Sequence, residues 1–150
     1  MNRTNPVSGP ENADSVKLID GQFCHFEQLR EAALVWDLDF RQLAEGRANH
    51  QLFQASTDNF ELIKTVFNVP YDQRSASHPH LRTFSILADE IPPASWCAQP
   101  FGSQALACFR PGEEFNSISS GYFTNFIFSL PETLLSQVAA SRFLLDWSSL

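Results

Sequence analysis

The sequence carries little positive charge. It has 10 Lys and Arg residues against 17 Asp and Glu residues, which gives a formal net charge of −7 at pH 7. Nucleic-acid binding takes most of its affinity from basic side chains that neutralise phosphates. We therefore expect this segment to be a poor binder of DNA by itself.

Long apolar runs and cysteine motifs are also missing. No stretch approaches the ~20 consecutive apolar residues that a helix needs to cross a bilayer, and residues 1–14 lack the apolar run of a signal peptide. Cys24, Cys97 and Cys108 lie far apart without a C-x-x-C motif, and an odd number does not suit a closed disulfide framework. These absences predict a cytoplasmic protein with no membrane partner.

The length of the chain fits one domain with a single core, since it has 150 residues. Residues 1–22 are expected to form a flexible N-terminal arm, because their first part is rich in Asn, Pro, Ser and Gly and has almost nothing to bury. Residues 23–150 then make up the folded domain.

The spacing of apolar residues predicts a mostly β protein. One short amphipathic helix is indicated where Phe26, Leu29 and Ala33 recur at helical spacing. From Asp37 onward the apolar period changes to two, and about eight short segments are separated by turns rich in Gly, Pro, Asn and Asp. A parallel α/β sheet is excluded, because its crossovers need a dozen or more residues. An antiparallel barrel or sandwich remains.

Helical spacing returns in the segment LPETLLSQVAASRFLLDW, which starts at Leu130. Pro131 suits a first helical turn, and Glu132 is favourable at the positive end of the helix dipole. The apolar stripe of this helix packs either on the outside of the barrel or on a second copy of the chain. The apolar end of the segment is more than a chain end usually exposes. We therefore expect a dimer surface made by Leu134, Leu135, Val138 and Arg142.

The order of the segments VWDLDFRQLAEG, NVPYDQRSASHPHLRTFSI, SWCAQ and FRPGEEFNSISSGYFTNFIFSLP resembles the N-terminal effector-binding and dimerisation domain of AraC-type bacterial transcription regulators. Two features carry most of the match. One is the W-D-x-x-x-R-Q-L-x-x-G string from Trp36 to Gly46. The other is the P-G-x-E-F turn from Pro111 to Phe115, followed by an aromatic last strand. After Trp96 the family often has a glycine, where this chain has Cys97.

The resemblance covers roughly residues 23–143 and implies a cupin-like jelly-roll barrel with helices packed outside. It further implies a barrel that binds a small-molecule effector, a homodimer, no catalysis and no cofactor. The paired helix-turn-helix units that normally follow such a domain are missing from the sequence. We expect that DNA is contacted only through that missing domain, so the chain is either shortened or a stand-alone relative.

Six side chains are the candidate ligand contacts. Tryptophan is a favoured wall of small-molecule pockets, because its indole N–H needs a partner. Polar residues that share a strand face with apolar ones can orient a polar effector. If the register is misjudged by one residue, these side chains point outward instead. Four phenylalanines, Phe84, Phe109, Phe126 and Phe128, are expected to fill the barrel. The candidate contacts are Trp36, Phe40, Gln42, Arg82, Phe84 and Trp96.

Two alternatives remain open. His78 and His80 are spaced so that both imidazoles of an extended chain could reach one metal ion, as in a metal-dependent cupin enzyme. The late strands offer no further histidine, so the ligand set is incomplete and we expect no metal and no catalytic residue. The other alternative is a protein-interaction module that binds no ligand, which would have a fully packed interior.

Overall fold

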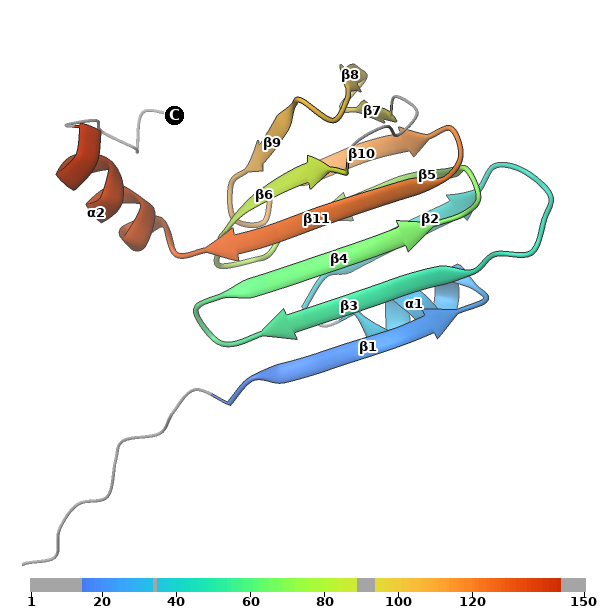
Figure 1. Cartoon of the computed structure of the whole chain (residues 1–150), viewed down its shortest axis with the longest axis horizontal. Coiled ribbons are helices and arrows are strands. Elements are labelled where there is room, and N and C mark those ends of the chain that lie inside the picture. The colour runs from blue at the N-terminus through green and yellow to red at the C-terminus, as the bar shows by residue number, and fades with distance from the viewer. Residues whose placement is uncertain (1–14, 34, 89–93, 144–150) are drawn as a thin grey trace, which may run out of the picture.

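The fold comes from a computed structural model, which describes residues 15–33, 35–88 and 94–143 (Figure 1). In chain order the elements are β1 (Lys17–Phe23), α1 (Phe26–Ala32), β2 (Asp37–Gln42), β3 (His50–Ser56), β4 (Glu61–Phe67), β5 (Tyr71–Ala76), β6 (Arg82–Leu87), β7 (Ala94–Trp96), β8 (Gln99–Phe101), β9 (Leu106–Phe109), β10 (Glu114–Ser119), β11 (Phe123–Leu130) and α2 (Glu132–Phe143).

The strands form two antiparallel sheets. Sheet A has six strands in the order β1-β3-β4-β11-β6-β9, and sheet B has five in the order β2-β5-β10-β7-β8. Sheet A lies in front of sheet B in Figure 1, and the chain crosses repeatedly between them. The prediction of a mostly β, antiparallel jelly roll with one short helix near the N-terminus and one C-terminal helix is confirmed.

Three strands were not expected from the sequence. Residues 17–22, predicted to belong to a flexible arm, lie in β1, which pairs along its whole length with β3. Pairing with β3 holds this segment at the edge of the sheet, and its residues Ile19 and Phe23 pack against the core. The rest of the expected arm, residues 1–14, lies outside the described residues. The other two strands are β8, which follows the two-residue turn of Cys97 and Ala98, and β10, which follows the turn at Pro111 and Gly112.

Helix α1 closes the side of the sandwich between β1 and β2, which are the edge strands of the two sheets. It packs against β1, β2 and β3, as the apolar spacing of its sequence predicts. Phe26 and Leu29 are buried, and Ala33 follows at the C-cap. The helix therefore lies where a lid over the interior would be placed.

The register of sheet A corrects four of the inward assignments. Thr83 and Ser85 of β6 point into the sandwich, so Arg82 and Phe84 lie on the outer face. Phe84 stacks there on Phe128, with ring centroids 5.1 Å apart, and Phe126 lies on the same outer face. Of the four phenylalanines expected inside, Phe109 alone packs in the core. The assignment failed because β6 and β11 carry their polar side chains inward.

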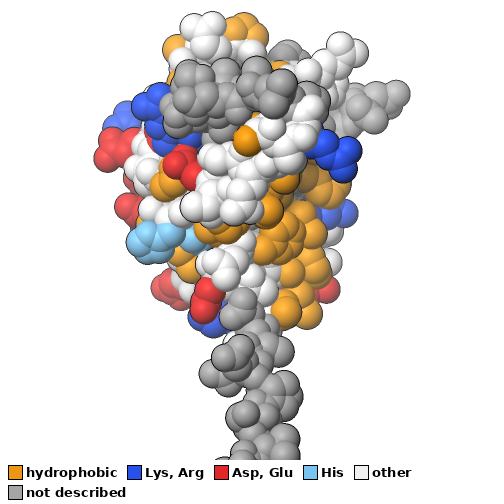
Figure 2. Space-filling view, turned by 90° about the vertical axis from the view of Figure 1, so that its left-hand side faces the viewer, with side chains coloured by type: hydrophobic (Ala, Val, Ile, Leu, Met, Phe, Trp, Pro, Cys, Tyr) orange, Lys and Arg blue, Asp and Glu red, His pale blue; other side chains and the backbone are white. Residues whose placement is uncertain are grey.

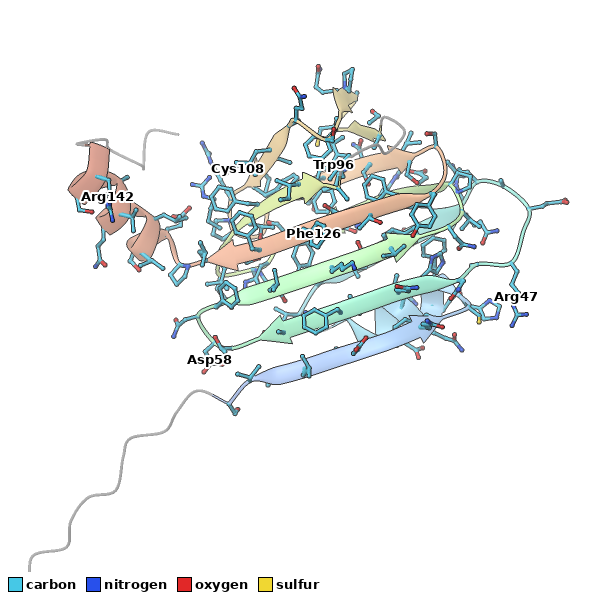
Figure 3. The ribbon with its side chains drawn as sticks, in the orientation of Figure 1. Arg47, Asp58, Trp96, Cys108, Phe126 and Arg142 are labelled. Atoms are coloured by element: carbon cyan, nitrogen blue, oxygen red, sulfur yellow. The ribbon has the colours of Figure 1, made fainter. Side chains whose placement is uncertain are left out.

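Helix α2 extends away from the two sheets, with Arg142 far from them (Figure 3). Its first turn is held by Glu132, whose Oε1 lies 2.7 Å from Nη2 of the buried Arg82. Leu134 and Val138 are 45% and 48% exposed, Leu135 is half-buried and Arg142 is exposed. The dimer surface predicted on this helix stays a prediction. No helix in the described ranges is long and apolar enough to cross a membrane.

His50 lies fully buried in an aromatic cluster at the α1 end of the interior. Its ring centroid is 4.1 Å from that of Phe26 and 5.2 Å from that of Phe67. Within the described part of the chain neither ring nitrogen has a hydrogen-bond partner. Burial lowers the pKa of His50 to about 4, so the imidazole is neutral in the fold at neutral pH.

The buried His50 makes stability depend on pH. Between pH 6.5 and about 4 the unfolded chain binds a proton that the folded chain does not, so the free energy of unfolding falls as the pH falls. We expect a slope from this residue that approaches about 1.4 kcal/mol per pH unit. In urea titrations from pH 7 to 4.5, His50→Leu should lose less stability than the wild type. Equal slopes would contradict the buried neutral imidazole.

Candidate functional site

A buried carboxylate, Glu61, joins the two sheets at one end of the interior. Its Oε2 accepts a hydrogen bond of 2.7 Å from Nε1 of Trp36, which directly precedes β2 of sheet B. Its Oε1 accepts one of 2.6 Å from Nε2 of Gln54 on β3. The hydroxyl of Ser129 on β11 lies 3.4 Å from Oε2 and donates to it. One side chain thus connects segments from both sheets.

The Glu61 carboxyl is fully buried and is paired with neutral donors. Glu61 has no exposed surface, and in the described chain no Lys or Arg forms an ion pair with it. Desolvation raises the pKa of this carboxyl above its usual range, although the bonds from Trp36, Gln54 and Ser129 act in the opposite direction. The hydrogen bonds therefore compensate for burial that would otherwise be costly.

More polar side chains continue from Glu61 along the interior. The hydroxyls of Thr83 and Ser129 lie 3.0 Å apart, and Ser85 donates to Oδ1 of Asn125 at 2.6 Å. Across the interior, on sheet B, Gln73 donates to Ser75 at 2.9 Å and accepts from Ser117 at 3.2 Å. Buried polar groups need such partners, and each sheet supplies its own. The interior is therefore polar at both walls, and these groups are satisfied within the protein.

Between the two sheets lies a cavity of about 40 Å³. Its walls come from sheet A, from sheet B and from α1, and most of them are apolar. The residues that surround it are Leu29, Ala33, Trp36, Leu38, Phe40, Leu52, Ile63, Thr65, Phe67, Tyr71, Gln73, Trp96, Phe115, Asn125 and Ile127. Small-molecule pockets have volumes of about 300–1,000 Å³, so this cavity is much smaller than a typical ligand pocket.

Trp96 of β7 is the one tryptophan wall of this cavity that lacks a hydrogen bond. The indole is 7% exposed and stacks on Phe115, with ring centroids 5.4 Å apart and an interplanar angle of 11°. Among the described residues no acceptor meets its buried Nε1. A buried indole N–H normally has a partner. Trp96, labelled in Figure 3, therefore lines the cavity and carries a donor that has no partner among the described residues.

The structure brings together three of the six candidate ligand contacts. Trp36, Phe40 and Trp96 all line the cavity. Gln42 is placed elsewhere, because its Nε2 donates to the carbonyl oxygens of Ala44 and Gly46 and holds the loop after β2.

The other two candidates, Arg82 and Phe84, do not face the interior. They lie on the outer face of sheet A, and the inward assignment was wrong. The strand alternates as expected, but small hydroxyl residues are turned inward because Ser129 and Asn125 provide their partners.

The histidine pair acts in a turn. Nδ1 of His78 accepts hydrogen bonds from the backbone N–H groups of His80 at 3.2 Å and Leu81 at 3.1 Å. The two rings are 6.3 Å apart between centroids and tilted by 70°. In the described residues no three His, Cys, Asp or Glu side chains gather as a metal site would require. His78 thus shapes the turn that leads into β6.

Several functional candidates were missed in the sequence. Glu61, Gln54 and Asn125 carry no motif, and an acid just after a turn reads as a solvent-exposed strand start. The only signal was the run of small polar residues at alternate positions of β6 and β11, which could have been interpreted as an inward polar face. The hydrophobic preference of strand interiors predicted instead that the phenylalanines of these strands face inward.

The fold defines the class of the chain as an antiparallel β domain of two facing sheets. No family model and no curated protein matches the sequence. Among solved structures, the chain is similar to the AraC-like transcriptional activator CuxR, with a TM-score of 0.58, 12% sequence identity, 83% of this chain covered and 51% of that chain. It is also similar to a cupin 2 conserved barrel domain protein from Salinispora arenicola, with a TM-score of 0.39, 12% identity, 68% of this chain covered and 91% of that chain.

At 12% identity the likeness to the activator shows the fold. The expectation that the chain shares the fold of AraC-type regulators is thereby confirmed. The chain spans about half the length of that activator.

Substitution of Glu61 tests the site's polar centre. We expect Glu61→Ala to lower the free energy of unfolding by about 2–4 kcal/mol, because it removes the acceptor of the buried Trp36 N–H together with one hydrogen bond of Gln54. Glu61→Gln keeps an acceptor oxygen and should cost about 1 kcal/mol or less. Because the pKa of Glu61 is raised in the fold, ionisation lowers the free energy of unfolding of the wild type as the pH rises. The stability of Glu61→Gln relative to the wild type should therefore increase from pH 4 to pH 7. Equal losses for both variants in urea titrations would contradict this account.

Proposed function

We propose that this chain is the effector-sensing and dimerisation domain of an AraC-type transcription regulator. In this proposal a small molecule binds between the two sheets, and DNA is contacted by a separate part of the regulator. The net charge of −7 supports the division, because a surface of this sign repels phosphates. The likeness in fold to an AraC-like activator, of which this chain spans about half, points to the same division.

The observation that carries the effector part is the unused donor of Trp96. A buried N–H without an acceptor costs free energy in the empty domain, and a ligand acceptor placed against it removes that cost. The stacked ring of Phe115 fixes the plane of the indole, so the donor direction is defined before binding. A molecule with an apolar body and a carbonyl or carboxyl oxygen matches these walls.

The proposed mechanism is a shift between a closed and an open arrangement of α1. The cavity of about 40 Å³ is too small for an effector, and Leu29 and Ala33 close it from the helix side. Val35, which follows shortly after α1, has φ of 70°, a conformation in which a β-branched residue is strained. Binding would favour the arrangement in which α1 is displaced, and the attached DNA-binding part would respond to that arrangement.

A second candidate function is a protein-interaction module without a ligand. The small volume of the cavity favours it, because a packed interior needs no effector. Neither candidate uses catalysis, and the engagement of His78 Nδ1 by two backbone N–H groups is consistent with both.

Trp96→Phe tests the effector proposal. The change removes the unused donor and keeps an aromatic wall, so the unfolding temperature of the empty domain should change little. We expect small molecules with an apolar body and a carbonyl or carboxyl group to stabilise the wild type in a thermal-shift screen. Their affinity for Trp96→Phe should be about tenfold or more weaker, the size expected for one hydrogen bond to a buried group.

The matched control is Ile118→Ala on the outer face of sheet B, which should bind as the wild type does. A screen in which no compound stabilises the wild type would favour the ligand-free module. Compounds that bind equally well to Trp96→Phe would place the effector somewhere other than this cavity.

A further inference from the structure

The side chain of Phe26, the first residue of α1, is surrounded by four other rings. It stacks on Phe40 with ring centroids 4.8 Å apart and an interplanar angle of 17°. The centroid of the His50 imidazole lies 4.1 Å from that of Phe26, and those of Phe67 and Tyr71 lie 6.0 and 5.9 Å from it. The four rings come from β2, β3, β4 and β5, and so from both sheets. Together Phe40, His50, Phe67 and Tyr71 form an aromatic box around Phe26.

His50 is the member of the aromatic box whose polar atoms are unused. Its side chain has no exposed surface, and among the described residues neither ring nitrogen has a hydrogen-bond partner. Elsewhere in the molecule histidine atoms reach the surface, as the pale blue atoms in Figure 2 show. A buried polar group without a partner costs free energy, so an apolar side chain would fill this position at lower cost. His50 is therefore suited to form a hydrogen bond with a bound molecule.

The aromatic box and the interior cavity share walls. Phe40, Phe67 and Tyr71 belong to the lining of the cavity as well as to the box. Leu29, which lies three residues after Phe26 and on the same face of α1, is another wall of the cavity. Displacement of the Phe26 ring would thus join the box to the cavity of about 40 Å³ and extend it toward β3.

Helix α1 is suited to release this ring. It has seven residues, and helices this short are marginally stable without tertiary contacts. Its N-cap residue, His25, makes no side-chain capping hydrogen bond. The helix lies at the edge of the sandwich beside β1 (Figure 1), and it buries Phe26 and Leu29 there. The packing of these two side chains is therefore what holds the helix against the sheets.

We propose that the aromatic box is a binding subsite for a phenol, and that Phe26 is an internal plug which the ring of the phenol displaces. In the bound form the ligand ring packs among Phe40, Phe67 and Tyr71, and its hydroxyl forms a hydrogen bond with His50. The inference rests on the proposed function, in which the effector lies between the two sheets, and it names the chemical class of that effector. The plugged form is the closed arrangement of α1, and the phenol-bound form is the open one.

A phenol matches the aromatic box in chemistry as well as in shape. Burial lowers the pKa of His50 to about 4, so its imidazole is neutral at neutral pH and has one donor and one acceptor nitrogen. A phenolic hydroxyl can both donate and accept a hydrogen bond, so either nitrogen can pair with it. Toluene has the same ring and a similar size but no hydrogen-bonding group. Comparing the two compounds therefore separates the contribution of His50 from that of the apolar walls.

Calorimetric titration of the whole chain with phenol and with toluene tests the subsite. We expect the wild type to bind phenol about tenfold or more tightly than toluene, the difference expected for one hydrogen bond to a buried group. His50→Leu should bind the two compounds with equal affinity. His80→Leu makes the same change at an exposed histidine and should keep the preference of the wild type for phenol.

Two changes at Phe26 test the displacement of the plug. Phe26→Leu keeps an apolar side chain without the ring, and Phe26→Ala opens the box further, since an engineered apolar cavity of about 150 Å³ binds benzene. Phenol affinity should rise from the wild type to Phe26→Leu and again to Phe26→Ala, by about tenfold in total, because less of the plug must be displaced. Phe26→Leu alone decides the question if Phe26→Ala does not fold. Phe128→Leu, the same change at a half-buried ring on the outer face of sheet A, should leave phenol affinity unchanged.

Three results would overturn the inference. If the wild type does not bind phenol while Phe26→Ala does, the plug is not displaced and the subsite exists only in the variant. Equal affinities of the wild type for phenol and toluene would show that His50 takes no part. Phenol binding that Trp96→Phe abolishes and His50→Leu leaves intact would locate the ligand at the Trp96 wall, which overturns the box and leaves the proposed function standing. Binding that depends on His50 and not on Trp96 would support the box and contradict the role of Trp96 in the proposed function.

Discussion

The carboxylate of Glu61 is the constraint on which the arrangement of the two sheets depends. It is fully buried, and its acceptors are used by donors from the segment before β2 and from β3 and β11. A buried carboxylate is tolerated only when such bonds compensate for lost water, so the bonds must form together. Because Trp36 reaches across from sheet B, the bonds also fix how far apart the two sheets lie at this end of the interior. The cavity beside them takes its shape from that distance.

Sheet A turns small polar side chains inward and large apolar side chains outward along β6 and β11. The inward Ser85 and Asn125 satisfy each other by a hydrogen bond. On the outer face Phe84 stacks on Phe128 and is only 6% exposed. The register of these strands, and not their hydrophobic content, therefore decides which side chains reach the interior.

The sequence was sufficient for the fold class, because turn residues and the change of period from helix to strand are local signals. It also placed Trp36, Phe40 and Trp96 correctly at the interior wall. It failed for Arg82 and Phe84, since a period of two does not say which face is inward and the hydrophobic rule selected the outer one. Glu61 could not be found, because its role depends on Trp36 and Ser129, which are 25 and 68 positions away.

The account depends most directly on the bond between Trp36 and Glu61, and a double-mutant cycle measures it. The free energies of unfolding of the wild type, Trp36→Phe, Glu61→Ala and the double variant would be determined in urea at pH 7. We expect a coupling energy of about 1–3 kcal/mol, the range for contacting residues in one buried hydrogen-bond network. Effects that add within about 0.3 kcal/mol would contradict the account, because Glu61 would then not tie the two sheets together.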